Sequence, residues 1–222
     1  MPKPFFIFDF DGTIADTFNI FLSVSNILSK EFHFRKIERH EVETLRHQTS
    51  LQILASLKIP LFKTPQIIKR ARQELAKQLS STYPFPGMQE ALLELKPLSQ
   101  DMGIITTNSA QNVKSFLEHH RLTFFNFILT TSRFSQKHEP LKKLRKILPP
   151  DQTIIYIGDE IRDIEAAKQA QVTSVAVTWG YNSPQVLRAY EPDYLADSPL
   201  ELLKICQQLS SSLDIMASEK NK

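Results

Sequence analysis

The sequence contains one cysteine, Cys206, and no long run of apolar residues. A single cysteine excludes a disulfide bond within the chain and fits a reducing compartment. The apolar run over residues 5–8 is too short for a secretory signal, and Asp9 and Asp11 follow it at once. No stretch is long and apolar enough to cross a bilayer. We therefore expect a cytoplasmic protein without a membrane partner.

The sequence also lacks a strong excess of either charge. Its 27 basic and 24 acidic residues give a formal net charge of +3, which is too small to predict a nucleic-acid partner. Basic residues gather between positions 142 and 146, but Leu141, Leu144 and Ile147–Leu148 recur among them at helical spacing. We interpret these charges as the solvated face of a helix. We expect no nucleic-acid partner, and either a monomer or a homodimer.

The 222 residues are enough for one sizeable core with a small insertion. The continuous apolar run Pro4–Phe8 is typical of a strand buried on both faces. Between about Ile20 and Leu79 only helical patterns recur, and the segment Pro84–Gly87 ends this stretch. Strand and helix patterns then alternate. The further strands that we predict are Met102–Thr106, Phe127–Thr130, Thr153–Ile157 and Ser174–Val177.

Repeated strand–helix units predict an α/β fold, with a doubly wound, Rossmann-like parallel sheet covered by helices on both faces. The helical stretch interrupts this pattern after the first strand. We predict an α/β core from residues 1–16 and 84–215, and an all-helical insertion over 17–83. We expect residues 216–222 to form a frayed tail.

Polar side chains follow four of the predicted strands. They are Asp9 and Asp11; Thr106, Thr107 and Asn108; Lys137; and Asp159 and Asp163. Ligands of open parallel sheets bind outside the carboxyl ends of the strands, so we expect these groups to meet at one rim. Carboxylates gathered there repel one another, and a divalent cation relieves that repulsion. Ligands that offer only oxygen favour Mg²⁺, and no His or Cys cluster competes for a softer metal.

These motifs carry a resemblance to a known family. The segment Phe8–Ile14, with Asp-Phe-Asp-Gly-Thr at its centre, resembles the first signature of the haloacid dehalogenase superfamily. Thr106 matches the second signature, Lys137 the third, and Gly158-Asp159 with Asp163 the fourth. An Asp-x-Asp motif alone is weak evidence. The ordered set of four, each after the right element, is strong.

The resemblance implies a phosphatase that uses Mg²⁺ and an aspartyl-phosphate intermediate. Asp9 would be the nucleophile, and Asp11 would protonate the leaving oxygen and then activate water. Asp159 would bind Mg²⁺ directly, together with the Asp9 carboxylate and the Asp11 backbone carbonyl. Asp163 would hold a metal-bound water or orient Lys137.

The remaining signature residues would bind the phosphoryl group. Thr106 and the backbone N–H groups near Thr107 and Asn108 would bind its oxygens, and Lys137 would neutralise charge. Simpler interpretations exist. The Asp9–Asp11 segment can form a turn with its glycine, and the Thr106–Asn108 segment can cap the next helix.

The two other site residues also have simpler interpretations. Lys137 alone would be a solvated surface lysine, and its assignment depends on its place in the series of motifs. Asp163 is compatible with an acidic residue in the first turn of a helix, where the helix dipole stabilises its charge.

The insertion resembles the helical cap of the phosphoglycolate phosphatase and β-phosphoglucomutase branch of this superfamily. Such a cap would close over the site, exclude water and choose the leaving group. Its hinges would lie near Asp16–Thr17 and Ser80–Pro86. Arg46 and His47 are the candidate cap residues for substrate contact. Arg46 would pair with a carboxylate or second phosphate, or lie on the surface, and His47 stands where related caps often have Gly.

The sequence therefore favours a phosphatase acting on a small phosphorylated metabolite, similar to phosphoglycolate phosphatase. A phosphosugar mutase that uses the same intermediate is the main alternative. A haloacid dehalogenase is disfavoured, because carbon–halogen cleavage needs neither Asp11 nor magnesium. A catalytically silent binding protein is disfavoured by the intact set of carboxylates. We interpret Trp179–Tyr181 and Pro192–Tyr194 as a core loop and a last-strand feature, rather than as catalytic.

Overall fold

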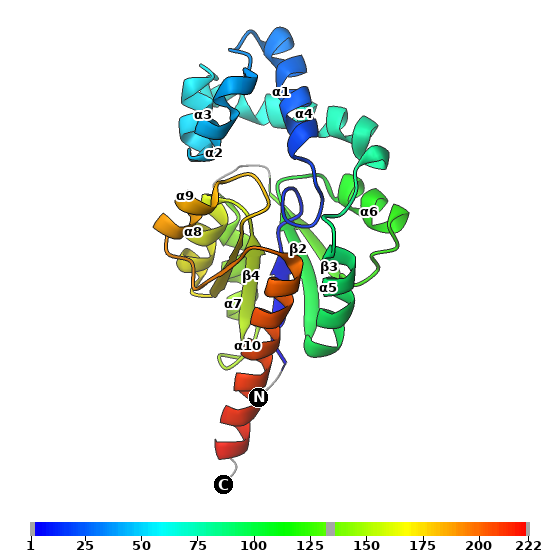
Figure 1. Cartoon of the computed structure of the whole chain (residues 1–222), viewed down its shortest axis with the longest axis vertical. Helices are drawn as coiled ribbons and strands as arrows, with labels where there is room; N and C mark the ends of the chain where they lie inside the picture. The colour runs from blue at the N-terminus through cyan, green and yellow to red at the C-terminus, as the bar shows by residue number, and fades with distance from the viewer. Residues whose placement is uncertain (1–2, 132–135, 221–222) are drawn as a thin grey trace.

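The computed structural model describes residues 3–131 and 136–220, which form a sheet-based core and a helical part above it (Figure 1). The core holds one six-stranded sheet. Its strands are β1 (Phe5–Phe8), β2 (Asp101–Thr106), β3 (Phe127–Thr130), β4 (Ile154–Gly158), β5 (Thr173–Val177) and β6 (Tyr194–Ala196). All neighbouring strands are parallel, in the order β3-β2-β1-β4-β5-β6.

Strand β1 lies at the centre of this sheet, between β2 and β4. Its register places Phe8 beside Ile104 on one side and beside Ile157 on the other. A strand in this position is covered on both faces, which explains why its sequence is apolar without alternation. The strand order reverses between β1 and β4, and this is the position at which open α/β sheets bind ligands.

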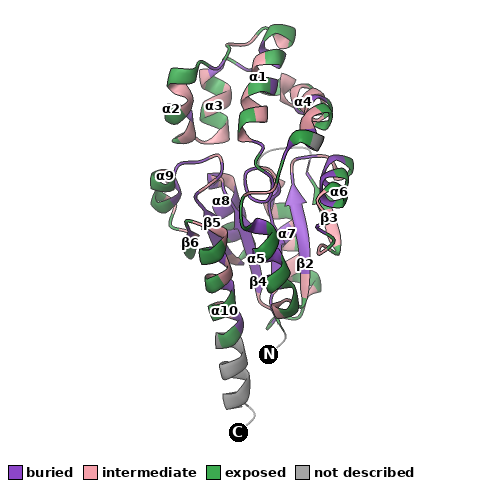
Figure 2. Ribbon diagram, turned by 45° about the vertical axis from the view of Figure 1, so that its right-hand side comes forward, coloured by how far each residue is buried: buried purple, intermediate pink, exposed green. Residues whose placement is uncertain are grey.

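Helices cover both faces of the sheet. The core helices are α5 (Met88–Leu95), α6 (Ala110–His119), α7 (His138–Ile147), α8 (Ile161–Ala170), α9 (Pro184–Ala189) and α10 (Pro199–Lys220). Phe6 and Phe8 of β1 pack with side chains of α5, α6 and α10, whereas Ile7 packs with those of α7 and α8. Figure 2 shows the buried strands between exposed helix faces. The alternation of side chains along β1 therefore divides the core into two apolar layers.

The helical part has its own small apolar core. Its helices are α1 (Phe18–Phe32), α2 (Val42–Arg46), α3 (Ser50–Ser56) and α4 (Thr64–Gln78), with short 3₁₀ turns η1 (Arg39–Glu41), η2 (Leu61–Lys63) and η3 (Leu79–Ser81) between or after them. The buried residues Ile37, Leu45, Leu57 and Ile59 form its centre. Thr49 begins α3 as an N-cap, with Gln52 completing a capping box.

Two linkers join this helical part to the core, and they pair with each other. The Asp16 N–H donates to the Tyr83 carbonyl, and the Phe85 N–H donates to the Ile14 carbonyl, each at 3.0 Å. A further bridge joins Asp11 to Ala15. Both linkers therefore leave the core beside the segment that follows β1. The boundaries that we gave for the core and the insertion stay predictions.

The α/β fold with its doubly wound parallel sheet is confirmed, and the five strands predicted with bounds lie within one residue of them. One detail differs. Ile147 is 76% exposed, although its spacing placed it on the apolar face of its helix. Helix α10 runs to Lys220, and the frayed tail that we gave for residues 216–222 stays a prediction. None of the helices in the described part of the chain combines the length and apolar character of a membrane span.

Candidate active site

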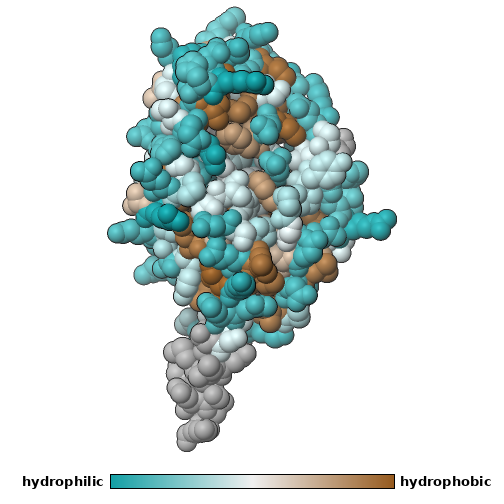
Figure 3. Space-filling model, in the orientation of Figure 1, coloured by the Kyte–Doolittle hydropathy of each residue, from teal (hydrophilic) through white to brown (hydrophobic). Residues whose placement is uncertain are grey.

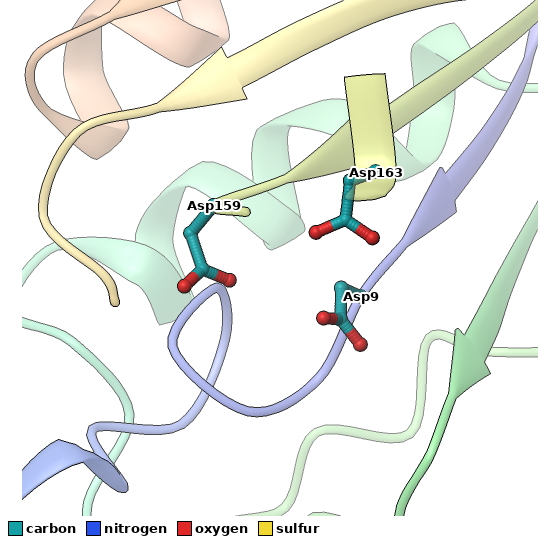
Figure 4. A group of neighbouring side chains, drawn as sticks. All are labelled: Asp9, Asp159 and Asp163. Atoms are coloured by element: carbon teal, nitrogen blue, oxygen red, sulfur yellow. The ribbon is translucent and has the colours of Figure 1, made fainter. Parts of the chain in front are cut away.

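Three buried carboxylates meet where the strand order reverses. Asp9 follows β1, Asp159 follows β4, and Asp163 lies in the first turn of α8. Each offers an oxygen atom within 4.8 Å of the oxygens offered by the other two. Figure 4 shows the Asp9, Asp159 and Asp163 carboxylates close together at this edge of the sheet. The three carboxylates therefore lie close together, as the order of the motifs along the chain predicts, and their functional assignment stays a prediction.

The buried ammonium group of Lys137 offsets part of the negative charge of these carboxylates. Its side chain is 1% exposed, so the interpretation as a solvated surface lysine is wrong. Its ammonium group donates to Asp163 Oδ1 at 2.7 Å and also to Asp9 Oδ2. Burial favours the neutral amine, but the carboxylates of Asp163 and Asp9 outweigh this effect and raise the pKa of Lys137. Lys137 therefore stays charged between two carboxylates.

The carboxyl groups of Asp9 and Asp159 nevertheless resist ionisation in the absence of a second cation. Burial raises the pKa of Asp9 to about 7, even though Lys137 opposes the shift. Burial, with added repulsion from Glu160, Asp9 and Asp163, raises the pKa of Asp159 well above its ordinary value. The Asp159 oxygens accept hydrogen bonds from two neutral donors, the Thr13 hydroxyl and the Tyr181 N–H, each at 2.7 Å. This oxygen-only set of ligands fits Mg²⁺.

The two oxygens of Asp163 have different partners. Its Oδ2 accepts from the Glu160 N–H at 3.1 Å and completes the capping box that begins α8. Its Oδ1 accepts from the Tyr156 hydroxyl at 3.0 Å as well as from Lys137. The first-turn position and the contact with Lys137 are therefore compatible with each other.

Asp11 lies two residues after Asp9, and hydrogen bonds from Asn108 hold its carboxyl group in place. The Asn108 side-chain amide donates to both Asp11 oxygens, at 3.2 and 3.0 Å. The Asn108 side-chain oxygen Oδ1 in turn accepts from the Ser109 N–H and from the Asn112 side-chain amide. Burial raises the pKa of Asp11, against the hydrogen bonds from Asn108 and Thr17. A carboxyl group with a raised pKa is suited to donate a proton.

The segment after β2 does not cap the next helix, which was its simpler interpretation. Ser109, and not Thr106–Asn108, caps helix α6, because its hydroxyl accepts from the Asn112 N–H. The Asn108 N–H donates to the Thr106 hydroxyl at 3.0 Å. The Thr107 carbonyl accepts from Arg72 of α4, with Nε at 2.7 Å. Thr106 is fully buried at the end of β2.

Sequence reasoning missed the loop that supports Asp159. The Tyr181 N–H holds this carboxylate, so the segment that we interpreted only as a core loop lies against the site. Gly12 adopts a φ of +78°, and a Cβ there would lie 2.3 Å from Asp159 Oδ2. A Cβ on Gly180 would lie 2.2 Å from the same atom. Gly12 of the Asp-Gly-Thr motif is visible in the sequence and is a signal that another group approaches the backbone closely there. The contact made by Tyr181 uses its backbone N–H, so the sequence gives no signal of it.

The cap candidates Arg46 and His47 lie in different settings. Arg46 donates to the Gly180 carbonyl at 3.0 Å and to the Tyr181 carbonyl at 3.1 Å. Its own carbonyl accepts from the Ser183 N–H at 2.9 Å. His47 is exposed, and its ring pairs with a carbonyl oxygen of its own helix. Arg46 thus fastens the helical part to the loop that holds Asp159.

Arg72 is a second fastening residue, and we had not singled it out. It projects from α4 and donates to the Thr107 carbonyl and to the Thr131 carbonyl, the latter at 2.7 Å. These carbonyls lie just beyond the ends of β2 and β3. In the sequence, Arg72 stands among other polar residues of an amphipathic helix. A solvated helix face has the same pattern, so the sequence offers no reason to single out Arg72.

We expect Arg46→Ala to loosen the contact between the helical part and the Asp159 loop. Loss of two hydrogen bonds, at about 0.5–1.5 kcal/mol each, should lower kcat/KM for p-nitrophenyl phosphate roughly tenfold. Amide hydrogen exchange at Ser183 should become faster. Arg39→Ala, which removes an exposed arginine of the same region, is the control. Unchanged exchange at Ser183 together with unchanged kcat/KM would refute the fastening role.

Comparisons with known proteins agree with this geometry. Residues 6–177 match the haloacid dehalogenase-like hydrolase family. A phosphoglycolate phosphatase from Synechococcus elongatus is 32% identical over 206 residues, covering 91% of this chain and 97% of that protein. The pyrophosphatase PpaX from Bacillus mycoides is 28% identical over 221 residues, covering 92% and 97%. The crystal structure of a predicted phosphatase from Clostridium acetobutylicum superposes with a TM-score of 0.77 at 20% identity, covering 94% and 100%.

The chain therefore belongs to the haloacid dehalogenase-like hydrolase family. Its similarity to phosphoglycolate phosphatase confirms the predicted branch, and it is a hydrolase that acts on phosphate esters.

Proposed function

We propose that this phosphatase depends on Mg²⁺ and transfers the phosphoryl group of a small phosphorylated metabolite to Asp9 before water releases it. The observation that carries the proposal is the buried cluster in which Asp9 contacts Lys137 and lies with Asp159 and Asp163 within 4.8 Å. The relative from Synechococcus elongatus makes 2-phosphoglycolate the first substrate to assay.

In the first step, a carboxylate oxygen of Asp9 attacks phosphorus, and the bond between phosphorus and the ester oxygen breaks. The leaving oxygen takes the proton of Asp11, whose raised pKa keeps that proton available. Asn108 holds the Asp11 carboxyl in place through two hydrogen bonds. Formation of the aspartyl-phosphate divides one difficult hydrolysis into two easier displacements.

In the second step, Asp11 accepts a proton from water as the water oxygen attacks the aspartyl-phosphate. The bond between phosphorus and Asp9 breaks, inorganic phosphate leaves, and Asp9 is regenerated. Thr106 and the Thr107 N–H would bind phosphoryl oxygens at the end of β2, and Lys137 would offset charge on Asp9 and the phosphate.

Asp9, Asp159, Asp163 and the Asp11 backbone carbonyl would hold the metal. When bound, Mg²⁺ supplies positive charge that brings carboxylate and phosphate oxygens together. The support for this assignment is chemical, because buried carboxylates with raised pKa values form an unfavourable group until a cation offsets their charge.

We expect chelation to abolish turnover and added Mg²⁺ to restore it. A second measurement does not depend on activity. The pKa of Asp9 is raised from 3.8 to about 7, so the metal-free fold loses stability as pH rises from about 4 to about 7, and the whole loss is present above that range. Mg²⁺ should offset this loss, so its effect on Tm should be larger at pH 8 than at pH 5. At a concentration of about 100 Kd the rise at pH 8 should be about 5–10 °C.

The control for the metal experiment is Asp151→Asn, which changes an exposed aspartate and should keep the full response. Asp159→Asn should lose it. An equal effect of Mg²⁺ on Tm at both pH values, or a full response in Asp159→Asn, would contradict the metal assignment.

A further inference from the structure

The helical part contains an apolar cavity of about 190 Å³. Its walls come from the four helices α1, α2, α3 and α4 and from the segments that join them. Apolar side chains that line it are Phe21, Val24 and Leu28 of α1, Leu54 of α3, and Ile68 and Ala71 of α4. Figure 3 shows hydrophobic side chains gathered in the middle of the helical part, above the region where it meets the core.

The cavity is continuous with the site described above. Asp11, Thr107 and Asn108 also line it, and they are the residues that would face the leaving oxygen and the phosphoryl group. An ester bound with its phosphorus beside Asp9 would therefore direct its organic part toward the helices. The cavity therefore adjoins the site at Asp11, Thr107 and Asn108.

The guanidinium groups that line the cavity are engaged by the protein itself. Arg46 donates to the carbonyls of the loop after β5, and Arg72 donates to the Thr107 and Thr131 carbonyls. Arg162 pairs with Glu160, and the Arg46 guanidinium also lies over the Phe18 ring, 5.6 Å from its centroid. None of the three is left to pair with a charge between the apolar walls. A charged leaving group would have to enter those walls without a matched partner, at a large cost in desolvation.

We propose that this cavity, lined by residues of α1, α2, α3 and α4, binds an apolar leaving group of the substrate. The occupant is the ring or short hydrocarbon chain of a phosphate monoester. This inference rests on the proposed function, because it places the phosphate beside Asp9. An apolar cavity of about 150 Å³ stays dry and holds a benzene ring. A cavity of about 190 Å³ is therefore large enough for a ring or for about six carbons.

The first test is a substrate series in the Mg²⁺-loaded wild-type protein. We expect kcat/KM to rise about three- to fourfold with each of the added methylenes from methyl to hexyl phosphate, and so by about 200- to 1,000-fold overall. Hexyl phosphate and phenyl phosphate should also exceed 2-phosphoglycolate. A flat or falling series, with methyl phosphate still hydrolysed, would overturn the cavity assignment and leave the proposed function standing.

The second test fills the cavity. Ala71→Phe should lower the ratio of kcat/KM for hexyl over methyl phosphate by at least about tenfold. Ala76→Phe, the same substitution at an exposed position of the same helix, should keep the wild-type ratio. If Ala71→Phe does not fold, Leu54→Ala enlarges the cavity instead and should move the preferred chain beyond hexyl. An unchanged ratio in folded Ala71→Phe, or an unchanged preferred length in Leu54→Ala, would overturn the inference.

A binding measurement separates this inference from the proposed function. Calorimetry on the wild-type protein with Mg²⁺ should give a dissociation constant for hexylphosphonate at least about 100-fold below that for methylphosphonate, with a negative heat-capacity change. If no ester is hydrolysed and this difference is still found, the cavity assignment stands and the proposed function fails. If the two phosphonates bind equally, the cavity assignment fails.

Discussion

Asp9→Asn is expected to lower kcat for p-nitrophenyl phosphate by about 10⁴-fold or more, because no other group can form the acyl phosphate. An amide is far less nucleophilic than a carboxylate, and it also removes one negative charge from the metal cluster. The fold should persist, since the amide has nearly the same shape and relieves repulsion with Asp163. Steady-state kinetics with circular dichroism of the same sample measures both effects.

The control for this variant is Asp16→Asn, which changes an exposed aspartate in the nearby linker. It should keep kcat within about twofold, since surface substitutions away from special features have small effects. Residual activity in folded Asp9→Asn above a few per cent of wild type would refute the nucleophile assignment.

Lys137→Met is expected to destabilise the protein by about 3–5 kcal/mol, because it leaves the buried Asp9 and Asp163 carboxylates without their partner. Methionine fills a similar volume, so the loss is electrostatic rather than a loss of packing. Urea denaturation should give a lower midpoint with an unchanged slope. Since a cation at the cluster offsets the same repulsion, Mg²⁺ should stabilise the variant more than it stabilises the wild type.

The matched control is Lys143→Met, which changes an exposed lysine of α7. It should shift the free energy of unfolding by no more than about 0.5 kcal/mol. Equal stability of folded Lys137→Met and wild type, at a pH where both carboxylates are ionised, would show that Lys137 does not compensate their charge.

Much of the core could be predicted because its sequence signals are local. The continuous apolar run before Asp9 indicates a strand covered on both faces, and β1 lies at the centre of the sheet. Repeated strand–helix units allow few topologies, so the meeting of Asp9, Asp159 and Asp163 followed from the fold. Helix ends were less certain. Ile147 matched the apolar spacing of α7, yet it lies in its last turn and is exposed.

The parts of the site that escaped prediction depend on contacts between distant segments. The Tyr181 N–H that holds Asp159 is a backbone group, and any residue except proline supplies one. Arg46 and Arg72 fasten the helical part through main-chain carbonyls, which have no sequence signature. The apolar residues around the cavity have the helical spacing that a filled core also requires, so the sequence alone predicts no cavity.

The most direct measurement is a rapid acid quench of turnover with substrate labelled in its phosphoryl group, followed by peptide mapping. A transient label on the peptide that contains Asp9, absent from Asp9→Asn and discharged at the rate of turnover, is the predicted result. A label on another residue, or release of labelled phosphate with no labelled protein at any quench time, would contradict it.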